Sequence, residues 1–201
     1  MYNGTKQKRD IKKLIDVAGA LLANGLFIFG SDFGKKGVTD TSAERLKNQL
    51  KKAEDVKVQS NYNFLTGYAN FAEADLDAGE TRELADDFLN ETGLEWGRSA
   101  HGGRSHRGFN VLDLDKKNTR HAYTFRDNPD DTMIIELRAH NHYSMCNGTY
   151  SEADGGGFCK FNRTGDPSKI KFKDLKRICN ELALAAAIYA KAPVPGQHQQ
   201  H

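Results

Sequence analysis

The sequence predicts an α+β protein with N-terminal helices, an antiparallel meander sheet and a long C-terminal helix packed on that sheet. Apolar residues recur at helical spacing near both ends of the chain, whereas residues 94–142 alternate between apolar and polar with period two. Short turn sequences separate the alternating segments, and short turns between successive strands imply antiparallel pairing. We expect one domain over residues 1–191, divided into a helical part (1–93), a sheet (94–163) and a closing helix (168–191).

The first predicted helix is Arg9–Ala23, in which apolar residues repeat every three or four positions, and Asn24-Gly25 ends it. Residues Leu26–Phe29 form either a short buried strand or a continuation of this helix into the core. A second helix follows Thr41, whose spacing to Glu44 matches a capping box, and its lysine-rich remainder is typical of a solvated face.

A further helix at Glu80–Asn90 ends at Gly93, after which the pattern changes to period two. The predicted strands are Leu94–Ala100, His106–Leu114, Thr119–Arg126 and Thr132–His142, with turns at 115–118 and 128–130. Residues Tyr143–Arg163 indicate a strand pair with a glycine-rich loop, and Phe172–Lys191 is the closing helix. We expect the proline- and glutamine-bearing tail, residues 192–201, to be disordered.

The composition limits the possible functions. The chain has 201 residues, enough for one substantial core, and its formal net charge of +2 argues against a dedicated nucleic-acid coat protein while leaving nucleic acid open as a ligand. Its three cysteines are an odd number, Cys179 fits the core stripe of the last helix, and no signal peptide is recognisable. We therefore expect a cytoplasmic protein with reduced thiols. The longest apolar stretch, Ala18–Phe29, is shorter than the roughly 20 residues that span a membrane.

The candidate functional residues centre on the predicted strand Met133–His142. Side chains along a strand alternate between its two faces, so the polar residues of this strand project together, and the apolar residues between them face the other way. These polar residues are Glu136, Arg138, His140 and His142. A strand face with a carboxylate, a guanidinium and two imidazoles predicts a site for a charged ligand.

Histidines and arginines are concentrated in the predicted sheet. Guanidinium groups bind phosphate or carboxylate oxygens in pairs, so arginines that converge on one sheet face would form an anion site. The further candidates for ligand binding are Arg107, Asn110, Arg120 and His121. Alternatively, these residues only cover the solvent face of an antiparallel sheet. That explanation is weaker for Glu136 and Arg138, because their strand is too apolar for a sheet edge.

Four of these residues carry a resemblance to a known family. Arg107 and Asn110 form an Arg-x-x-Asn segment, and Glu136 and Arg138 form a Glu-x-Arg strand that precedes a long helix. Over Gly97–Lys191 this order resembles the distal half of the amidoligases of phage and bacterial genomes, which are relatives of glutamine synthetase and the glutamate–cysteine ligases.

The resemblance implies ATP- and magnesium-dependent joining of a carboxylate to an amine. Glu136, with His142 on the same strand face, would be the metal ligand, and Arg138 with Arg107 would hold phosphate or the substrate carboxylate. The family also has an early strand with two alternating glutamates in the metal site, and nothing before residue 40 supplies them. The chain would then be a degenerate member, or half of a split enzyme whose partner chain supplies the missing carboxylates.

Three other hypotheses stay open. In a metal-independent endoribonuclease, Glu136 would be the general base and His140 or His121 the general acid, while Arg138 and Arg120 would stabilise the charged phosphorane. A zinc site at His140, His142, Cys146 and Cys159 lacks a supporting CxxC pair, which makes zinc an unlikely cofactor. The non-catalytic alternative is a phage-type factor that binds a small molecule, a nucleotide or a phosphate-recognising partner.

Overall fold

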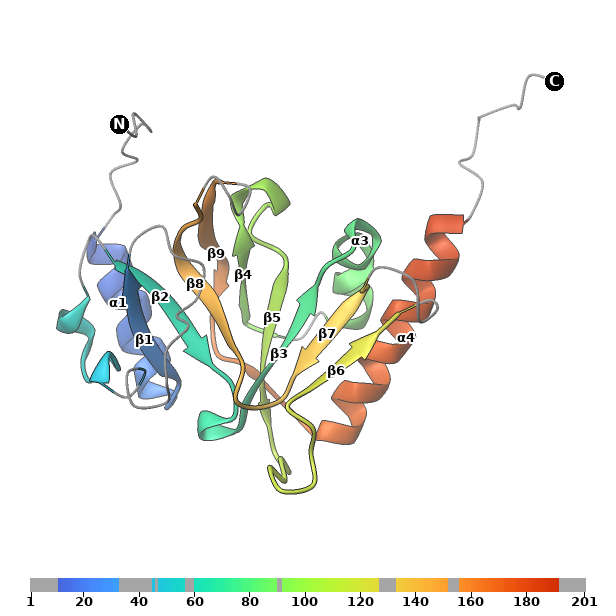
Figure 1. Cartoon of the computed structure of the whole chain (residues 1–201), viewed down its shortest axis with the longest axis horizontal. Helices are drawn as coiled ribbons and strands as arrows, with labels where there is room; N and C mark the ends of the chain where they lie inside the picture. Colours follow the sequence, from blue (N-terminus) through green and yellow to red (C-terminus); the bar gives the residue numbers. More distant parts are fainter. Residues whose placement is uncertain are drawn as a thin grey trace, which may run out of the picture.

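The computed structural model describes residues 11–32, 45, 47–56, 60–89, 92–126, 133–151 and 156–191 and has the α+β architecture that the sequence predicts (Figure 1). Its helices are α1 (Ile11–Ala23), α3 (Gly79–Phe88) and α4 (Phe172–Lys191). Its strands are β1 (Phe27–Asp32), β2 (Ser60–Leu65), β3 (Phe71–Leu76), β4 (Leu94–Arg98), β5 (His106–Val111), β6 (Ala122–Phe125), β7 (Ile135–Arg138), β8 (Tyr143–Thr149), β9 (Phe158–Thr164) and β10 (Ser168–Ile170). Short 3-10 turns are η1 (Ala53–Asp55), η2 (Tyr68–Asn70) and η3 (Ser99–His101).

The strands form one curled sheet in the order β1-β2-β8-β9-β4-β5-β3-β7-β6, as Figure 1 shows. Each pairing along this path is antiparallel, and β10 pairs with β5 in parallel. The expected meander is therefore wrong in its connectivity, since β3 lies between β5 and β7, which both follow it in the chain. The expected helical part, residues 1–93, also contains strands β1, β2 and β3.

The two faces of the sheet pack against different helices. On the side that we call the α4 face, alternate residues of β3, β5 and β7 pack with α3 and α4. On the opposite side, the α1 face, Phe64, Phe71 and Trp96 join the core that α1 covers. Burying apolar area on both faces stabilises the sheet by about 25 cal/mol for each Å² removed from water.

Close packing on the α1 face requires a glycine at one central position. A Cβ atom on Gly108 of β5 would lie 2.8 Å from the ring of Phe71 and 2.9 Å from the side chain of Leu94. A larger residue would therefore push apart the aromatic core or the strands that carry it.

Helix α4 has the predicted bounds and the predicted stripe. Leu175, Cys179, Leu182 and Ala186 are buried at helical spacing against the sheet, so the assignment of Cys179 to the core is confirmed. Tyr189, three residues beyond Ala186, is 52% exposed, because the last turn of the helix extends past the buried core.

Other expected elements are found close to their predicted bounds. The helix before Asn24 and the helix before Gly93 are α1 and α3, and Leu26–Phe29 contributes to a strand, β1. The capping box at Thr41, the turn at 128–130 and the tail 192–201 lie outside the described residues.

In the part of the chain that the structure describes, none of the helices combines the length and the apolar character that a membrane crossing requires.

A pair of leucines on α4 tests the packing of this helix. Leu182 is fully buried in the α4-face core, so Leu182→Ala should lower the free energy of unfolding by about 2–5 kcal/mol through lost contacts and a residual cavity. Leu184, two residues away, is 59% exposed, and Leu184→Ala should change it by no more than about 0.5 kcal/mol. Urea unfolding of both variants measures the difference, and equal effects would contradict this packing.

Candidate functional site

The pairing of β3 with β7 brings charged residues together on the α1 face. In the ladder Glu73 lies opposite Arg138, and Asp75 lies opposite Glu136. Because residues two apart on a strand share a face, all four side chains project to the same side. The prediction that Glu136 and Arg138 project together is therefore confirmed.

The guanidinium of Arg138 contacts three carboxylates with three different nitrogen atoms. Its Nη1 lies 2.9 Å from Glu73, its Nη2 lies 2.7 Å from Asp75 and its Nε lies 2.6 Å from Glu136. Burial alone would lower the pKa of Arg138, but the three carboxylates outweigh burial and raise this pKa above its ordinary value. Arg138 is therefore permanently charged.

Glu73 is the fully buried member of this group. Its second carboxylate oxygen accepts a hydrogen bond from the hydroxyl of Ser144 on β8. With one oxygen on Arg138 and the other on Ser144, Glu73 is fixed from two sides. This arrangement satisfies a carboxylate whose burial would otherwise be very costly.

His106 of β5 lies beside the carboxylates. Its ring stacks on the indole of Trp96, with centroids 5.2 Å apart and an interplanar angle of 10°, and its Nδ1 lies 3.4 Å from Asp75. Burial lowers the pKa of His106 to about 4, although Glu73 opposes this effect. The imidazole is therefore neutral at neutral pH and can donate or accept a hydrogen bond.

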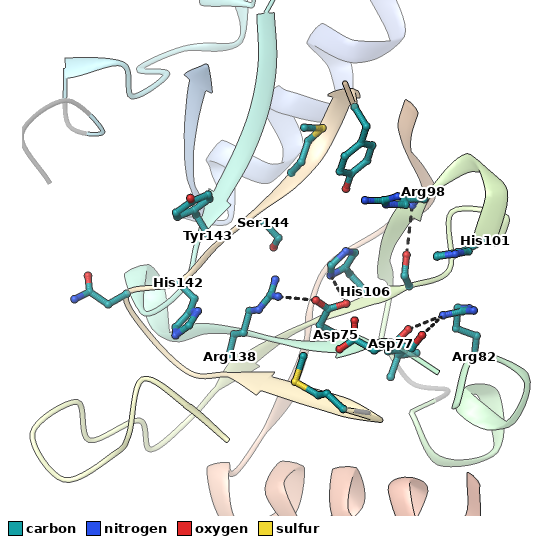
Figure 2. Close-up of a pocket in the computed structure, with 16 residues that line it drawn as sticks. Asp75, Asp77, Arg82, Arg98, His101, His106, Arg138, His142, Tyr143 and Ser144 are labelled. Atoms are coloured by element: carbon teal, nitrogen blue, oxygen red, sulfur yellow. Dashed lines mark hydrogen bonds and ion pairs between the residues drawn. The ribbon is translucent and has the colours of Figure 1, made fainter. Parts of the chain in front are cut away.

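These groups border a cavity of about 710 Å³, a size typical of small-molecule sites. Asp75, Asp77, His106 and Arg138 lie in its centre (Figure 2). Figure 2 shows Arg82, Arg98 and His101 on one side of these groups, and His142, Tyr143 and Ser144 on the other side. The remaining lining residues are Leu76, Ser105, Met133, Asn141, Met145 and Tyr150.

The two arginines on the basic side are held without carboxylate partners. Arg82 donates from Nη1 to the carbonyl oxygens of Leu76 at 2.9 Å and Asp77 at 2.8 Å. The guanidinium of Arg98 lies 4.1 Å from the ring centroid of Tyr150, a cation–π contact. Among the described residues neither arginine forms an ion pair, so both charges remain available to an anion.

Two ring nitrogens in the cavity wall are buried without a hydrogen-bond partner among the described residues. They are Nδ1 of His101 and Nδ1 of His106. Buried polar atoms are nearly always hydrogen-bonded, so unpartnered atoms beside a cavity are typical of groups that a ligand or water satisfies.

The pKa of Asp77, at the end of β3, is raised from 3.8 to about 6. Partial desolvation in the cavity wall is the main cause, and the neighbouring charge of Asp75 adds to it, while Arg138 acts in the opposite direction. A carboxylate with a raised pKa in a cleft is typical of functional sites, since a bound cation would relieve the repulsion.

Within the described part of the chain, no three His, Cys, Asp or Glu side chains are placed so that they could already hold a metal ion. Magnesium, however, usually binds one or two carboxylates together with substrate phosphates. Asp75 and Asp77 fit that mode, because Asp75 lies near the end of β3, Asp77 directly follows this strand, and both line the cavity. Zinc ligation by Cys146 and Cys159 is disfavoured, because burial raises the pKa of both thiols.

The two candidate histidines after β7 are separated by a sharp turn at Asn141, whose φ is 62°. His142 lines the cavity. His140 does not: its Nε2 lies 2.9 Å from the carbonyl oxygen of Thr119, and its ring lies 4.5 Å from that of His121. His140 and His121 therefore fasten the segment before β6 to the end of β7.

Arg107 lies on the α4 face, away from the cavity. Its fully buried guanidinium pairs with the buried Glu95 on β4, and its Nη2 lies 2.9 Å from Asp86 on α3. Arg104 and Arg163 also contact Asp86. This network attaches α3 to the sheet, so the structure gives Arg107 a packing role.

The other two candidates also lie away from the cavity. Asn110 is four residues beyond His106 on β5, opposite Phe71 and Lys169. Arg120 is exposed in the segment before β6, where its backbone N–H donates to the hydroxyl of Tyr123.

Sequence reasoning missed the acidic residues of β3. Glu73, Asp75 and Asp77 alternate through an otherwise apolar segment, and this spacing is itself a detectable signal for carboxylates on one strand face. His106 and Arg98 lack a comparable signal, because their approach to the cavity depends on the long-range pairing of β3, β4 and β5. Arg82 is held locally by the carbonyl oxygens of Leu76 and Asp77.

The sequence matches no protein-family model and no curated protein. The functional interpretation therefore depends on the geometry of the cavity.

The raised pKa of Asp77 predicts a pH-dependent effect on stability. Because the native state holds the Asp77 proton more tightly than the unfolded state, ionisation of this group costs stability as pH rises from 3.8 through about 6. Asp77→Asn removes this cost. In urea unfolding the variant should gain stability over the wild type across this range and keep the gain at higher pH, whereas a difference independent of pH would contradict the assignment.

The buried pair of Arg107 and Glu95 predicts that removal of one partner costs more unfolding free energy than replacement of both partners. Glu95→Ala leaves the Arg107 guanidinium buried with Asp86 as its remaining partner and should cost about 3–5 kcal/mol of unfolding free energy. The double variant Glu95→Gln with Arg107→Met removes the charge together with its partner and should cost much less. Chemical denaturation of both proteins tests this, and equal costs would contradict a pairing role.

Proposed function

We propose that this protein is a magnesium-dependent enzyme that binds a nucleoside triphosphate and transfers its nucleotidyl group to an acceptor hydroxyl, with release of pyrophosphate. The observation that carries the proposal is the position of Asp75 and Asp77 in the middle of the cavity, between a basic side and a polar, aromatic side (Figure 2).

The carboxylates support the metal dependence. Asp75 and Asp77 offer hard oxygen ligands, and the phosphates of the nucleotide would complete the coordination of Mg²⁺. Bound there, the metal would polarise a phosphoryl oxygen and neutralise the charge that develops in an in-line displacement. The basic side chains around the carboxylates would hold the remaining phosphate oxygens.

The distribution of charge favours reaction at the α-phosphorus. Arg82 and Arg98 lie on one side of the carboxylates and suit the β- and γ-phosphates, which carry most of the charge and leave as pyrophosphate. Tyr143 lies on the other side (Figure 2), where an aromatic ring suits a base. The α-phosphorus of a nucleotide bound in this orientation lies next to Asp75 and Asp77.

In the proposed reaction the oxygen of the acceptor hydroxyl attacks the α-phosphorus while the bond to the bridging oxygen of pyrophosphate breaks. The hydroxyl proton needs an acceptor, and the neutral imidazole of His106, whose Nδ1 lies 3.4 Å from Asp75, would accept it. Arg138 would stabilise the charge on the phosphoryl oxygens.

A second candidate is the ATP-dependent ligation of a carboxylate to an amine. It is favoured by Glu73 and Asp75, which alternate on a strand beside Glu136. The amidoligase family has two alternating glutamates in its metal site, and Glu73 with Asp75 would supply comparable carboxylates from this chain. In this reaction the γ-phosphoryl group would be transferred, and the products would be ADP and phosphate.

Product analysis separates these functions. The protein is incubated with Mg²⁺, each nucleoside triphosphate and an oligonucleotide with a free 3′-hydroxyl, and pyrophosphate and the extended oligonucleotide are measured. We expect both products with Mg²⁺ and neither with a chelator. ADP and phosphate formed only with an acid and an amine would establish the ligase instead, and RNA cleavage in the chelator would establish the ribonuclease.

Variants test the residues. Asp75→Asn and Asp77→Asn should each lower the rate of pyrophosphate release by about 10²-fold or more, since each removes a charge that acts on the transition state. The matched control is Asp115→Asn, because Asp115 lies in an exposed turn where it accepts hydrogen bonds from Lys117 and Asn118. Equal rates for all three variants and the wild type would reject the proposed site.

A further inference from the structure

The guanidinium of Arg138 lies against Asp75, one of the two carboxylates assigned to the metal ion. The guanidinium bonds three carboxylates, one with each nitrogen, and Asp75 is the member of this set that lines the cavity (Figure 2). Nη2 of Arg138 lies 2.7 Å from one oxygen of Asp75, so a metal ion at that oxygen would compete with the positive charge of the guanidinium.

The other two contacts keep Arg138 in place when the contact with Asp75 is broken. Glu73 is fully buried behind the cavity and is fixed by Ser144, and Glu136 bonds Nε of the guanidinium. Neither carboxylate lines the cavity. Loss of the Asp75 contact therefore frees Nη2 for a phosphate oxygen while the rest of the guanidinium stays bonded.

An independent observation shows that the neighbourhood of Asp75 is built for a ligand. His106 is 7% exposed, lines the cavity and has a buried Nδ1 without a hydrogen-bond partner among the described residues. This nitrogen lies 3.4 Å from Oδ1 of Asp75, whereas Arg138 bonds Oδ2, so His106 and Arg138 lie beside different oxygens of the same carboxylate.

We propose that Arg138 is a positioning residue that blocks Asp75 in the absence of nucleotide and makes metal binding depend on the nucleotide. A metal ion alone must compete with the guanidinium without compensation. When the metal ion binds together with a triphosphate, the phosphate oxygens of the triphosphate bond the freed Nη2. Metal and nucleotide therefore bind with positive coupling, and such coupling typically changes the affinity for each ligand by about 5- to 150-fold. This inference rests on the proposed function.

The test measures the binding of Mn²⁺, as a probe for Mg²⁺, by isothermal titration calorimetry. Each protein is titrated with and without an ATP analogue that has a methylene bridge between the α- and β-phosphorus. The wild type should bind Mn²⁺ at least about tenfold more tightly with the analogue than without it.

The decisive variant is Arg138→Met with Glu73→Gln, which removes the guanidinium together with the buried carboxylate that would be left unpaired. It should bind Mn²⁺ alone about tenfold more tightly than the wild type does, and the gain in Mn²⁺ affinity on adding the analogue should be smaller than in the wild type. Arg138→Lys is the conservative second variant. Its ammonium cannot bond three carboxylates with separate nitrogens, so its affinity for Mn²⁺ alone should also rise.

The matched control is Arg107→Met with Glu95→Gln, which removes a buried arginine–glutamate pair from the opposite face of the same sheet. Its Mn²⁺ affinity should equal that of the wild type. If the wild type binds Mn²⁺ with the analogue but neither Arg138 variant gains affinity for Mn²⁺ alone, the blocking role is wrong and the proposed function stands. If the wild type binds neither the analogue nor Mn²⁺, both are wrong.

Discussion

A connection of four residues constrains the shape of the whole sheet. Strands β7 and β8 follow each other in the chain, with only residues 139–142 between them, yet β3, β5, β4 and β9 separate them in the sheet. In a flat sheet five strand spacings amount to about 24 Å. The chain between Arg138 and Tyr143 can span at most about 18 Å. The sheet must therefore curl to close this connection, and the cavity lies on the inside of the curl, with Arg138 and Tyr143 on its wall.

The curl places charges in a partly enclosed space, and the packing determines how each one is compensated. On the α1 face the carboxylates of β3 and β7 share one guanidinium, while on the α4 face Glu95 and Asp86 share three. The second set holds α3 on the sheet. The first set borders a cavity with unpaired arginines and unpartnered imidazoles, and this difference separates a candidate reaction centre from a structural ion-pair network.

Local patterns predicted the elements with one covered face, because periodicity is visible where one side is apolar and the other polar. This applies to α4 and to the alternation in β7. Strand β3 was missed because both of its faces are covered, with alanines under the helices and Phe71, Glu73 and Asp75 on the other side. Arg107 was assigned to the site because a sequence pattern shows which residues share a face without showing which face holds the cavity. His106 and Arg107 are adjacent on β5, and only the pairing of that strand decides between them.

The alternation of β5 also protects the chain from misfolding. A slip of one residue in the pairing of this strand would turn every side chain to the opposite face. The imidazole of His106 would then lie beneath α3, and the guanidinium of Arg107 would leave Glu95 and Asp86 without their buried partner. Because an unpaired buried charge costs several kcal/mol, the shifted pairing is excluded on electrostatic grounds as well as by packing. The ion pairs of Arg107 with Glu95 and Asp86 thus help to fix the register in which β5 pairs with its neighbouring strands.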